Sequence, residues 1–275
     1  MSAAASTSSP IRLIAIDLDG TLLDDRKRIS AKTVEALSGL GARGVKVVIA
    51  SARPPRSVRH VYAALKLDTL QINYNGALIW DEPGKKRHLH CPLPGPVVRQ
   101  IVEHARNMHP DVLVSCELLD RSYTDRVDPN YNTETGRLFA PDVIAPLDQF
   151  FNVSMTKILL LGDQQKLMEI EMSLGMAFDD HVSLVRTDND LIQIMDKRVD
   201  KSIALKWVAR HYGISMSQVL AIGDAANDIG MLRLAGAAVA MGNGHPATRA
   251  AAHWVAPSNN DHGVHAALVR YGLCE

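Results

Sequence analysis

Three short runs of branched apolar residues, each stopped by small or acidic residues, are the feature that most limits how this chain can fold. They cover residues 12–17, 45–50 and 218–222. Because successive residues are apolar, these runs are typical of strands buried on both faces, as in parallel sheets. Residues with helical spacing lie between them at 31–40, 55–65 and 202–212. The alternation predicts right-handed βαβ units in an α/β fold with a doubly wound parallel sheet.

The alternation of buried strands and helices is interrupted in the middle of the chain. Residues 81–96 are rich in Pro, Gly and basic side chains, and they are interpreted as a connection in which prolines block regular structure. Beyond them, helices at 97–108 and 164–174 alternate with extended segments of more antiparallel character. We therefore expect residues 84–195 to form an inserted α+β domain.

The remaining boundaries follow from this insertion. Residues 11–83 and 196–275 become the two segments of one discontinuous, Rossmann-like core, with a third strand of the sheet predicted at 71–75. Residues 1–10 are rich in Ala, Ser and Thr and lack the basic and apolar regions of a signal peptide, so we expect a disordered leader.

Composition excludes several classes of protein. Thirty Lys and Arg balance thirty Asp and Glu, which argues against nucleic-acid or polybasic membrane partners. No stretch approaches the roughly 18 apolar residues of a membrane-spanning helix. Three cysteines in 275 residues do not make a disulfide framework. We expect a cytoplasmic protein, monomeric or weakly dimeric.

Each buried run leads directly into a group of polar residues. The groups are Asp17-Leu-Asp19-Gly-Thr21, Ser51-Ala-Arg53 and Gly223-Asp224-Ala-Ala-Asn227-Asp228. Ligands bind beyond the carboxyl ends of the strands in open α/β sheets, so these groups converge if the strands are neighbours. Four carboxylates with no His or Cys among them suit a hard cation bound through oxygen, which indicates Mg²⁺ rather than Zn²⁺.

Such a site favours phosphoryl chemistry. A carboxylate beside Mg²⁺ can attack phosphorus and form an aspartyl-phosphate. The cation and a lysine would neutralise the transferring phosphoryl group, and Ser51 with backbone N–H groups would hold its oxygens. An Asp-x-Asp pair alone is common in turns, so the catalytic interpretation depends on the combination and order of the three groups.

This combination resembles the haloacid dehalogenase superfamily, in particular its Cof-type phosphatases, in which a large α/β cap is inserted after the third core strand. The resemblance rests on the segments 17–23, 49–54, 197–201 around Lys201, and 223–228 with Met231-Leu232. Weaker similarities are found at 73–77, 239–243 and 259–264. Together they cover both core segments, whereas the middle third matches only in size and placement.

The resemblance implies a role for each acidic residue. Asp17 corresponds to the nucleophile and to a Mg²⁺ ligand. Asp19 corresponds to the general acid that protonates the leaving alcohol and then activates water, and its backbone carbonyl reaches the metal. Asp224 corresponds to a direct Mg²⁺ ligand and Asp228 to an indirect or water-mediated one. Asp24 and Asp25 lie past the motif and are interpreted as a solvated turn.

The resemblance also implies a substrate- and phosphate-binding set, made of Ser51, Ala52, Arg53, Lys201, Asn227 and Asn75. Ser51 and Lys201 correspond to the residues that hold phosphate. Arg53 either orients substrate or pairs with an acid of the core. The sequence departs from the family at three places, with Ala52 and Ser202 where Gly is usual and His262 in a segment that is more often acidic.

The function implied is Mg²⁺-dependent hydrolysis of a small phosphorylated metabolite, such as a sugar phosphate or nucleotide, with residues 84–195 as a cap that selects substrate and gates solvent. One alternative is a phosphomutase of the phosphomannomutase type, which Arg121, Arg126 and Arg137 keep open. The other is a catalytically silent phosphate-binding module, against which the joint presence of Asp17, Asp19, Lys201 and Asp224 argues.

Overall fold

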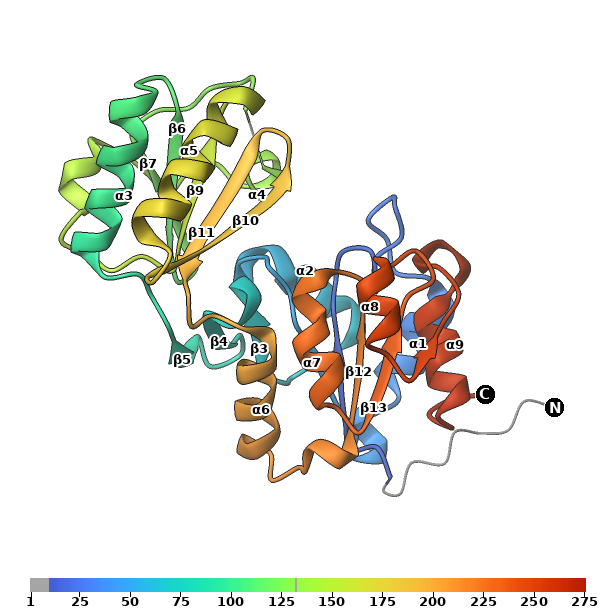
Figure 1. The fold of residues 1–275 in the computed structure, drawn as a ribbon. Coiled ribbons are helices and arrows are strands. Elements are labelled where there is room, and N and C mark those ends of the chain that lie inside the picture. The colour runs from blue at the N-terminus through green and yellow to red at the C-terminus, as the bar shows by residue number, and fades with distance from the viewer. Residues whose placement is uncertain (1–9, 132) are drawn as a thin grey trace. The chain divides into compact units, whose positions relative to one another are not determined.

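The computed structural model describes residues 10–131 and 133–275 in two compact units (Figure 1). The core unit combines the described residues up to His88 with Asp200–Glu275, and the inserted unit is Leu89–Val199. The leader expected at residues 1–10 lies outside the described residues except for Pro10. The role of the inserted unit as a cap stays a prediction.

The core unit is built on a five-stranded parallel sheet of order β14-β13-β12-β1-β2. Its strands are β1 (Leu13–Ile16), β2 (Lys46–Ile49), β12 (Val219–Gly223), β13 (Ala237–Ala240) and β14 (Trp254–Val255). The three predicted runs are the neighbouring strands β12, β1 and β2, and the chain winds outward from β1 in both directions. The doubly wound α/β fold class is confirmed.

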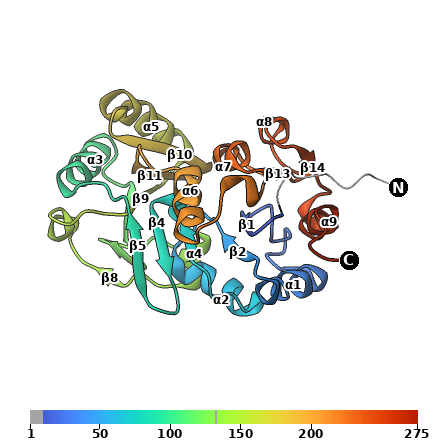
Figure 2. The same ribbon diagram turned by 90° about the horizontal axis from the view of Figure 1, so that it is seen from below.

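Helices cover both faces of this sheet (Figure 2). The helices on one face are α1 (Ala31–Ser38), α2 (Pro55–Leu65) and α9 (Gly263–Arg270), whose apolar side chains share a core with Ile14 and Ile16 of β1. The helices on the other face are α6 (Lys201–His211) and α7 (Ile229–Leu234), and α8 (Pro246–Ala250) follows β13. The Asp200 side chain starts α6 by accepting a hydrogen bond from the N–H of Ser202 (2.5 Å).

Two predictions about the third strand and the connection after it are wrong in detail. β3 (Gln71–Asn73) pairs antiparallel with β4 (Leu78–Asp81) and belongs to a separate three-stranded sheet with β5 (Lys86–His90). A single parallel bridge between Ala50 and Ile72 joins β3 to the end of β2. The chain reverses after β3 because residues 74–76 all have positive φ. β5 lies between the prolines of the connection, so these prolines border regular structure without preventing it.

The inserted unit is an α+β layer with a six-stranded sheet of order β10-β11-β9-β6-β7-β8. Its strands are β6 (Leu113–Leu118), β7 (Arg121–Thr124), β8 (Val143–Ile144), β9 (Lys157–Leu161), β10 (Val182–Asp188) and β11 (Leu191–Asp196). Helices α3 (Gly95–Met108) and α5 (Gln164–Phe178) cover one face with a shared apolar core, and α4 (Glu134–Leu138) lies in the β7–β8 connection. All ladders except β7–β8 are antiparallel, as the sequence predicted.

Short 3₁₀ turns occur at Gly41–Arg43, Tyr74–Gly76, Leu147–Phe150, Met216–Gln218, Ala226–Asp228 and Asn259–Asp261. Within residues 10–131 and 133–275, no helix has the length and apolar content needed to cross a membrane.

We expect Ile14→Ala to lower the free energy of unfolding of the core unit by about 2–5 kcal/mol, because Ile14 is fully buried in β1, between β12 and β2, and its truncation leaves a cavity. All three tryptophans, at positions 80, 207 and 254, lie in the core unit, so urea unfolding followed by their fluorescence measures this unit. Ile203→Ala is the matched control because Ile203 is 58% exposed, and it should change stability by less than about 1 kcal/mol. Equal losses in both variants would contradict the packing described above.

Candidate active site

The predicted polar groups start from one edge of the parallel sheet. Ile16, Ile49 and Ile222 lie side by side in register at the ends of their strands. Asp17 directly follows β1, and its N–H donates to the carbonyl of Ile222 (2.9 Å). The chain segments that carry Asp17, Ser51 and Asp224 therefore leave neighbouring strands at the same level, as the sequence predicted.

Lys201 connects two of the acidic residues. Its Nζ donates to Oδ1 of Asp17 (2.5 Å) and to Oδ1 of Asp228 (2.8 Å). Asp17, Asp228 and Lys201 are 6%, 0% and 1% exposed. Burial works against the charge of Lys201, but the two carboxylates outweigh it and raise the pKa of this lysine. The ammonium group is therefore fixed as a cation beneath the edge of the sheet.

Three carboxylates gather around this cation and can hold a metal ion. One oxygen from each of Asp17, Asp224 and Asp228 lies within 4.8 Å of the other two. Burial, and after it the charge of Asp228, holds the pKa of Asp17 well above its usual range, although Lys201 opposes this. Burial also raises the pKa of Asp224. One ammonium group leaves this oxygen-only cluster short of positive charge, so its chemistry fits a hard divalent cation.

The two aspartates of the 223–228 segment differ in their contacts. Both oxygens of Asp228 accept hydrogen bonds from the protein, since Oδ2 accepts the N–H groups of Asp224 and Ala225 at 3.0 Å and Oδ1 accepts Lys201. Asp224 is half-buried and accepts a hydrogen bond from Oγ1 of Thr21 (2.6 Å). Asp228 thus shapes the turn that presents Asp224. The sequence motif contained Thr21, but no role was predicted for it.

Asp19 lies outside the carboxylate cluster. Arg53 binds it through two hydrogen bonds, Nε to Oδ2 at 2.7 Å and Nη2 to Oδ1 at 2.6 Å, and Lys27 Nζ is 2.8 Å from Oδ1. Burial alone would raise the pKa of Asp19, but the hydrogen bonds and charges of Arg53 and Lys27 outweigh it and lower this pKa. Two roles were predicted for Arg53, and the structure shows one of them, the pairing with an acid. Lys27 was missed because no motif marks it.

The Ser51 segment forms a tight turn after β2. Ser51 is buried, its N–H donates to the carbonyl of Ile72 (2.8 Å), and its Oγ accepts the N–H of Arg53 (3.1 Å). Ala52 lies half-buried in the bend between them. The hydroxyl of Ser51 therefore orders the turn that directs Arg53 toward Asp19.

A strained turn after β3 connects three of these segments. Tyr74, Asn75 and Gly76 have φ values of 51°, 55° and 102°, and positive φ is unusual for residues other than glycine. The N–H of Asn75 donates to the carbonyl of Ser51 (3.0 Å), and its Oδ1 accepts Nδ2 of Asn227 (2.9 Å). A Cβ atom on Gly76 would lie 2.5 Å from the carbonyl oxygen of Asp200, the residue before Lys201. The structure thus places Asn75 and Asn227 together, next to Ser51.

Comparison with known proteins agrees with this geometry. A family model described as haloacid dehalogenase-like hydrolase matches residues 14–268. The chain is 30% identical over 271 residues to the 5-amino-6-(5-phospho-D-ribitylamino)uracil phosphatase of Bacillus subtilis, a match that covers 94% of this chain and 97% of that protein. It is 27% identical over 239 residues to the HMP-PP phosphatase of Escherichia coli O6:H1, with 87% of each chain covered.

Among solved structures, a haloacid dehalogenase-like hydrolase from Bacteroides thetaiotaomicron is similar with a TM-score of 0.85 and 27% identity, covering 94% of this chain and 99% of that one. The chain therefore belongs to the haloacid dehalogenase-like hydrolases, and the resemblance to their Cof-type members is confirmed. It is an enzyme of the phosphatase type.

We expect Gly76→Ala to destabilise the core unit more than a glycine replacement that has only an unfavourable φ. The added Cβ would displace Asp200, at a cost of at least about 2 kcal/mol beyond the backbone strain. Gly213→Ala is the matched control, because Gly213 also has a positive φ (66°) but has no atom within 4 Å of the added Cβ, so that only about 1 kcal/mol of strain is expected. Urea unfolding compares the two variants, and equal losses would show that the contact with Asp200 does not hold the turn.

Proposed function

We propose that this protein is a Mg²⁺-dependent phosphatase that hydrolyses a small phosphorylated metabolite through an aspartyl-phosphate on Asp17. The observation that carries the proposal is the position of Asp17, held 2.5 Å from the Lys201 ammonium inside a cluster of carboxylate oxygens that suits a divalent cation. The predicted Mg²⁺ ligands are Asp17, Asp224, the backbone carbonyl of Asp19 and, indirectly, Asp228. When bound, the cation lowers the repulsion between Asp17 and an anionic substrate.

In the first step, an Asp17 oxygen attacks phosphorus as the bond from phosphorus to the leaving oxygen breaks. Lys201 and the turn at Ser51 hold the phosphoryl oxygens, and Lys201 balances negative charge in the transition state. Asp19 donates a proton to the leaving oxygen, so that the alcohol departs neutral. The product of this step is the acyl-phosphate on Asp17.

In the second step, Asp19 takes a proton from water as that water attacks phosphorus, and the bond from phosphorus to the Asp17 oxygen breaks. Asp17 returns as a carboxylate and inorganic phosphate is released. Arg53 pairs with Asp19 and lies on the same turn as Ser51, so substrate oxygens compete with Asp19 for its guanidinium. Transfer of Arg53 to the substrate would release Asp19 for proton transfer.

Small phosphorylated substrates are supported by the names of the two related phosphatases, one of which acts on a phosphorylated ribitylaminouracil. The phosphomutase alternative is less well supported. Arg126, one of the arginines that left a second phosphate site open, donates from Nη2 to the backbone carbonyls of Pro110 (3.1 Å) and Val112 (2.8 Å). That contact gives Arg126 a structural role within the inserted unit.

We further propose that the inserted unit selects the substrate through the face of its sheet opposite α3 and α5. On this face Lys157 Nζ lies 3.2 Å from Oε1 of Gln193 and 3.4 Å from Oε2 of Glu117. Four leucines, at positions 113, 159, 161 and 191, lie on the same face further along these strands. A compact set of charged and amide groups beside apolar side chains is suited to recognising the polar groups of a leaving alcohol.

Turnover of p-nitrophenyl phosphate tests the proposed reaction. Activity should require Mg²⁺ and fall to background in excess EDTA, and Asp17→Asn should lower kcat by about 10³-fold or more because an amide is a poor nucleophile. Asp68→Asn is the matched control, since Asp68 is exposed on the core unit, and it should keep wild-type kcat. Undiminished turnover in EDTA would contradict the metal assignment, and an Asp17→Asn variant with a tenth of wild-type kcat would contradict the aspartyl-phosphate.

Substitution of Lys157 tests selection by the inserted unit. Lys157→Met should change kcat/KM for sugar phosphates by about tenfold relative to p-nitrophenyl phosphate, because one buried charged contact is worth about 1–3 kcal/mol. Inhibition by inorganic phosphate should change less than about twofold. The control is Lys166→Met at a half-exposed lysine of α5. A uniform loss on all substrates, with phosphate inhibition weakened in parallel, would show that this face supports the fold and does not select substrates.

A further inference from the structure

Three asparagines outside the carboxylate cluster hold the loop that carries Asp19. We call Asn243, Asn259 and Asn260 the asparagine latch. Nδ2 of Asn243 donates to the carbonyl of Gly20 (2.8 Å), and Nδ2 of Asn259 donates to the carbonyl of Leu23 (3.0 Å). The two residues are joined, because the N–H of Asn259 donates to Oδ1 of Asn243 (2.9 Å).

Asn259 and Asn260 also bind Asp25, at the far end of this loop. Nδ2 of Asn260 is 2.9 Å from Oδ2 of Asp25, and Oδ1 of Asn260 accepts the N–H of Asp25 (3.1 Å). Nδ2 of Asn259 is 3.2 Å from Oδ1 of Asp25. The turn interpreted as merely solvated therefore has specific partners more than 230 positions away in the sequence.

The latch contacts two segments that carry proposed catalytic or metal-binding groups. On the loop side, Gly20 follows Asp19, Leu23 is bridged to Asp19, and Lys27 binds the Asp19 carboxylate. On the other side, the next turn is fixed to the metal-binding segment, since the N–H of His245 donates to the carbonyl of Asp224 (2.9 Å). The latch therefore connects the segment of Asp224 to the loop of Asp19.

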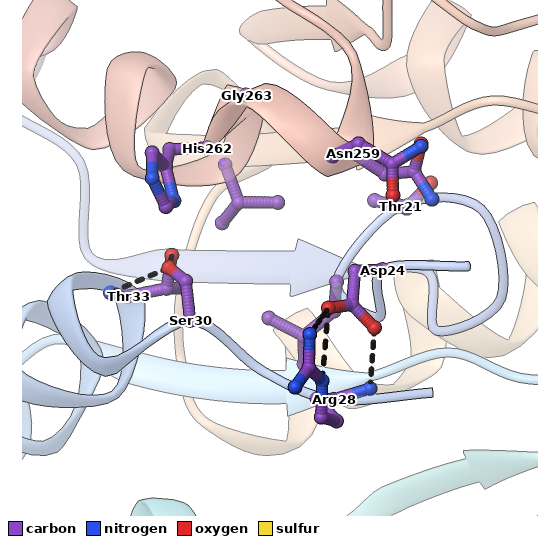
Figure 3. Close-up of a pocket in the computed structure, with 11 residues that line it drawn as sticks. Thr21, Asp24, Arg28, Ser30, Thr33, Asn259, His262 and Gly263 are labelled. Carbon is purple, nitrogen blue, oxygen red and sulfur yellow. Dashed lines mark hydrogen bonds and ion pairs between the residues drawn. The ribbon is translucent and has the colours of Figure 1, made fainter. Parts of the chain in front are cut away.

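Packing gives the loop little support on one side. A cavity of about 50 Å³ lies there, lined by residues that include Thr21, Asp24, Ser30, Asn259 and His262. In Figure 3, Asn259 and Thr21 lie on one side of this space, across from Ser30 and Thr33. Side chains that border a void lose contacts on that side, so the hydrogen bonds of the latch add to the core packing of Leu22 and Leu23 in fixing the direction of the loop.

We propose that Asn243 and Asn259 are positioning residues for proton transfer by Asp19: through the Gly20 and Leu23 carbonyls, they set where the Asp19 carboxylate meets the leaving oxygen. This inference rests on the proposed function, in which Asp19 is the general acid. Because the two amides are neutral, they hold the loop without adding charge to a site that already contains several carboxylates.

The inference can be tested with two aryl phosphates, only one of which needs an acid to protonate its leaving group. Phenyl phosphate loses a strongly basic phenolate, whereas 2,4-dinitrophenyl phosphate loses a stable anion that needs no proton. kcat/KM includes only steps up to departure of the leaving group, so hydrolysis of the aspartyl-phosphate does not enter it. Asn243→Ala and Asn259→Ala should lower kcat/KM by about 10–100-fold for phenyl phosphate and less than about threefold for 2,4-dinitrophenyl phosphate.

Asp19→Asn gives the reference pattern, with the same selectivity and a larger loss. If Asp19→Asn slows both substrates equally, the acid role in the proposed function is wrong. If Asp19→Asn is selective but the latch variants slow both substrates equally or neither, the positioning inference alone is overturned. Asn107→Ala, at an exposed position on α3, is the matched control and should behave as wild type.

A conservative variant keeps the test decisive if an alanine variant fails to fold. Asn243→Asp retains the oxygen that accepts the N–H of Asn259 but replaces the donor to the Gly20 carbonyl with a second oxygen. It should fold, as judged by thermal melting, and show the same selective loss on phenyl phosphate. If Asn243→Asp folds and keeps the wild-type ratio of kcat/KM between the two substrates, the hydrogen bond from Asn243 to the Gly20 carbonyl does not position Asp19.

Discussion

The buried ammonium group of Lys201 is the interaction on which the rest of this site depends. Three carboxylates converge at one sheet edge, and without a cation each would raise the pKa of the others. Lys201 offsets part of this repulsion from 2.5 and 2.8 Å, and removing one partner of such a buried pair typically costs about 3–5 kcal/mol. It reaches this position because α6 begins at Lys201, and the residue before it packs against the backbone of Gly76.

Two aspartates only two positions apart receive opposite environments. Asp17 is buried with Lys201 beside other carboxylates, which raises its pKa, whereas Asp19 is bound by Arg53 and Lys27, which lower its pKa. Side chains two positions apart in extended backbone share a face, so the two environments differ through their partners: Lys201 binds Asp17, whereas Arg53 and Lys27 draw the Asp19 carboxylate away from the cluster. The proposed roles therefore need both environments to change: a bound cation would favour the Asp17 carboxylate as nucleophile, and transfer of Arg53 to the substrate would let Asp19 hold a proton.

Side-chain amides hold the loops around the charged centre. Asn75 connects the Ser51 turn to Asn227, and the asparagine latch connects the Asp19 loop to the segment that follows Asp224. An amide both donates and accepts hydrogen bonds and carries no net charge. It can therefore fix loop carbonyls and N–H groups beside the carboxylates without changing the electrostatic balance that Lys201 and a bound cation would provide.

The sequence by itself determined the α/β class, the strands β1, β2 and β12, the helices α1, α2, α3, α5 and α6, and the acidic and serine positions that meet at the sheet edge. These follow from local signals, because strand burial and motif spacing are written in neighbouring residues. The position of Lys201 came from the family resemblance. Only the tertiary structure decided that β3 leaves the parallel sheet, that Arg53 and Lys27 pair with Asp19, and that Asn259 reaches back to Leu23. The side-chain contacts among these join residues from 8 to 236 positions apart, and hydrogen bonds across such separations have no periodic signature in the sequence. They form only when folding brings loops of fixed direction together.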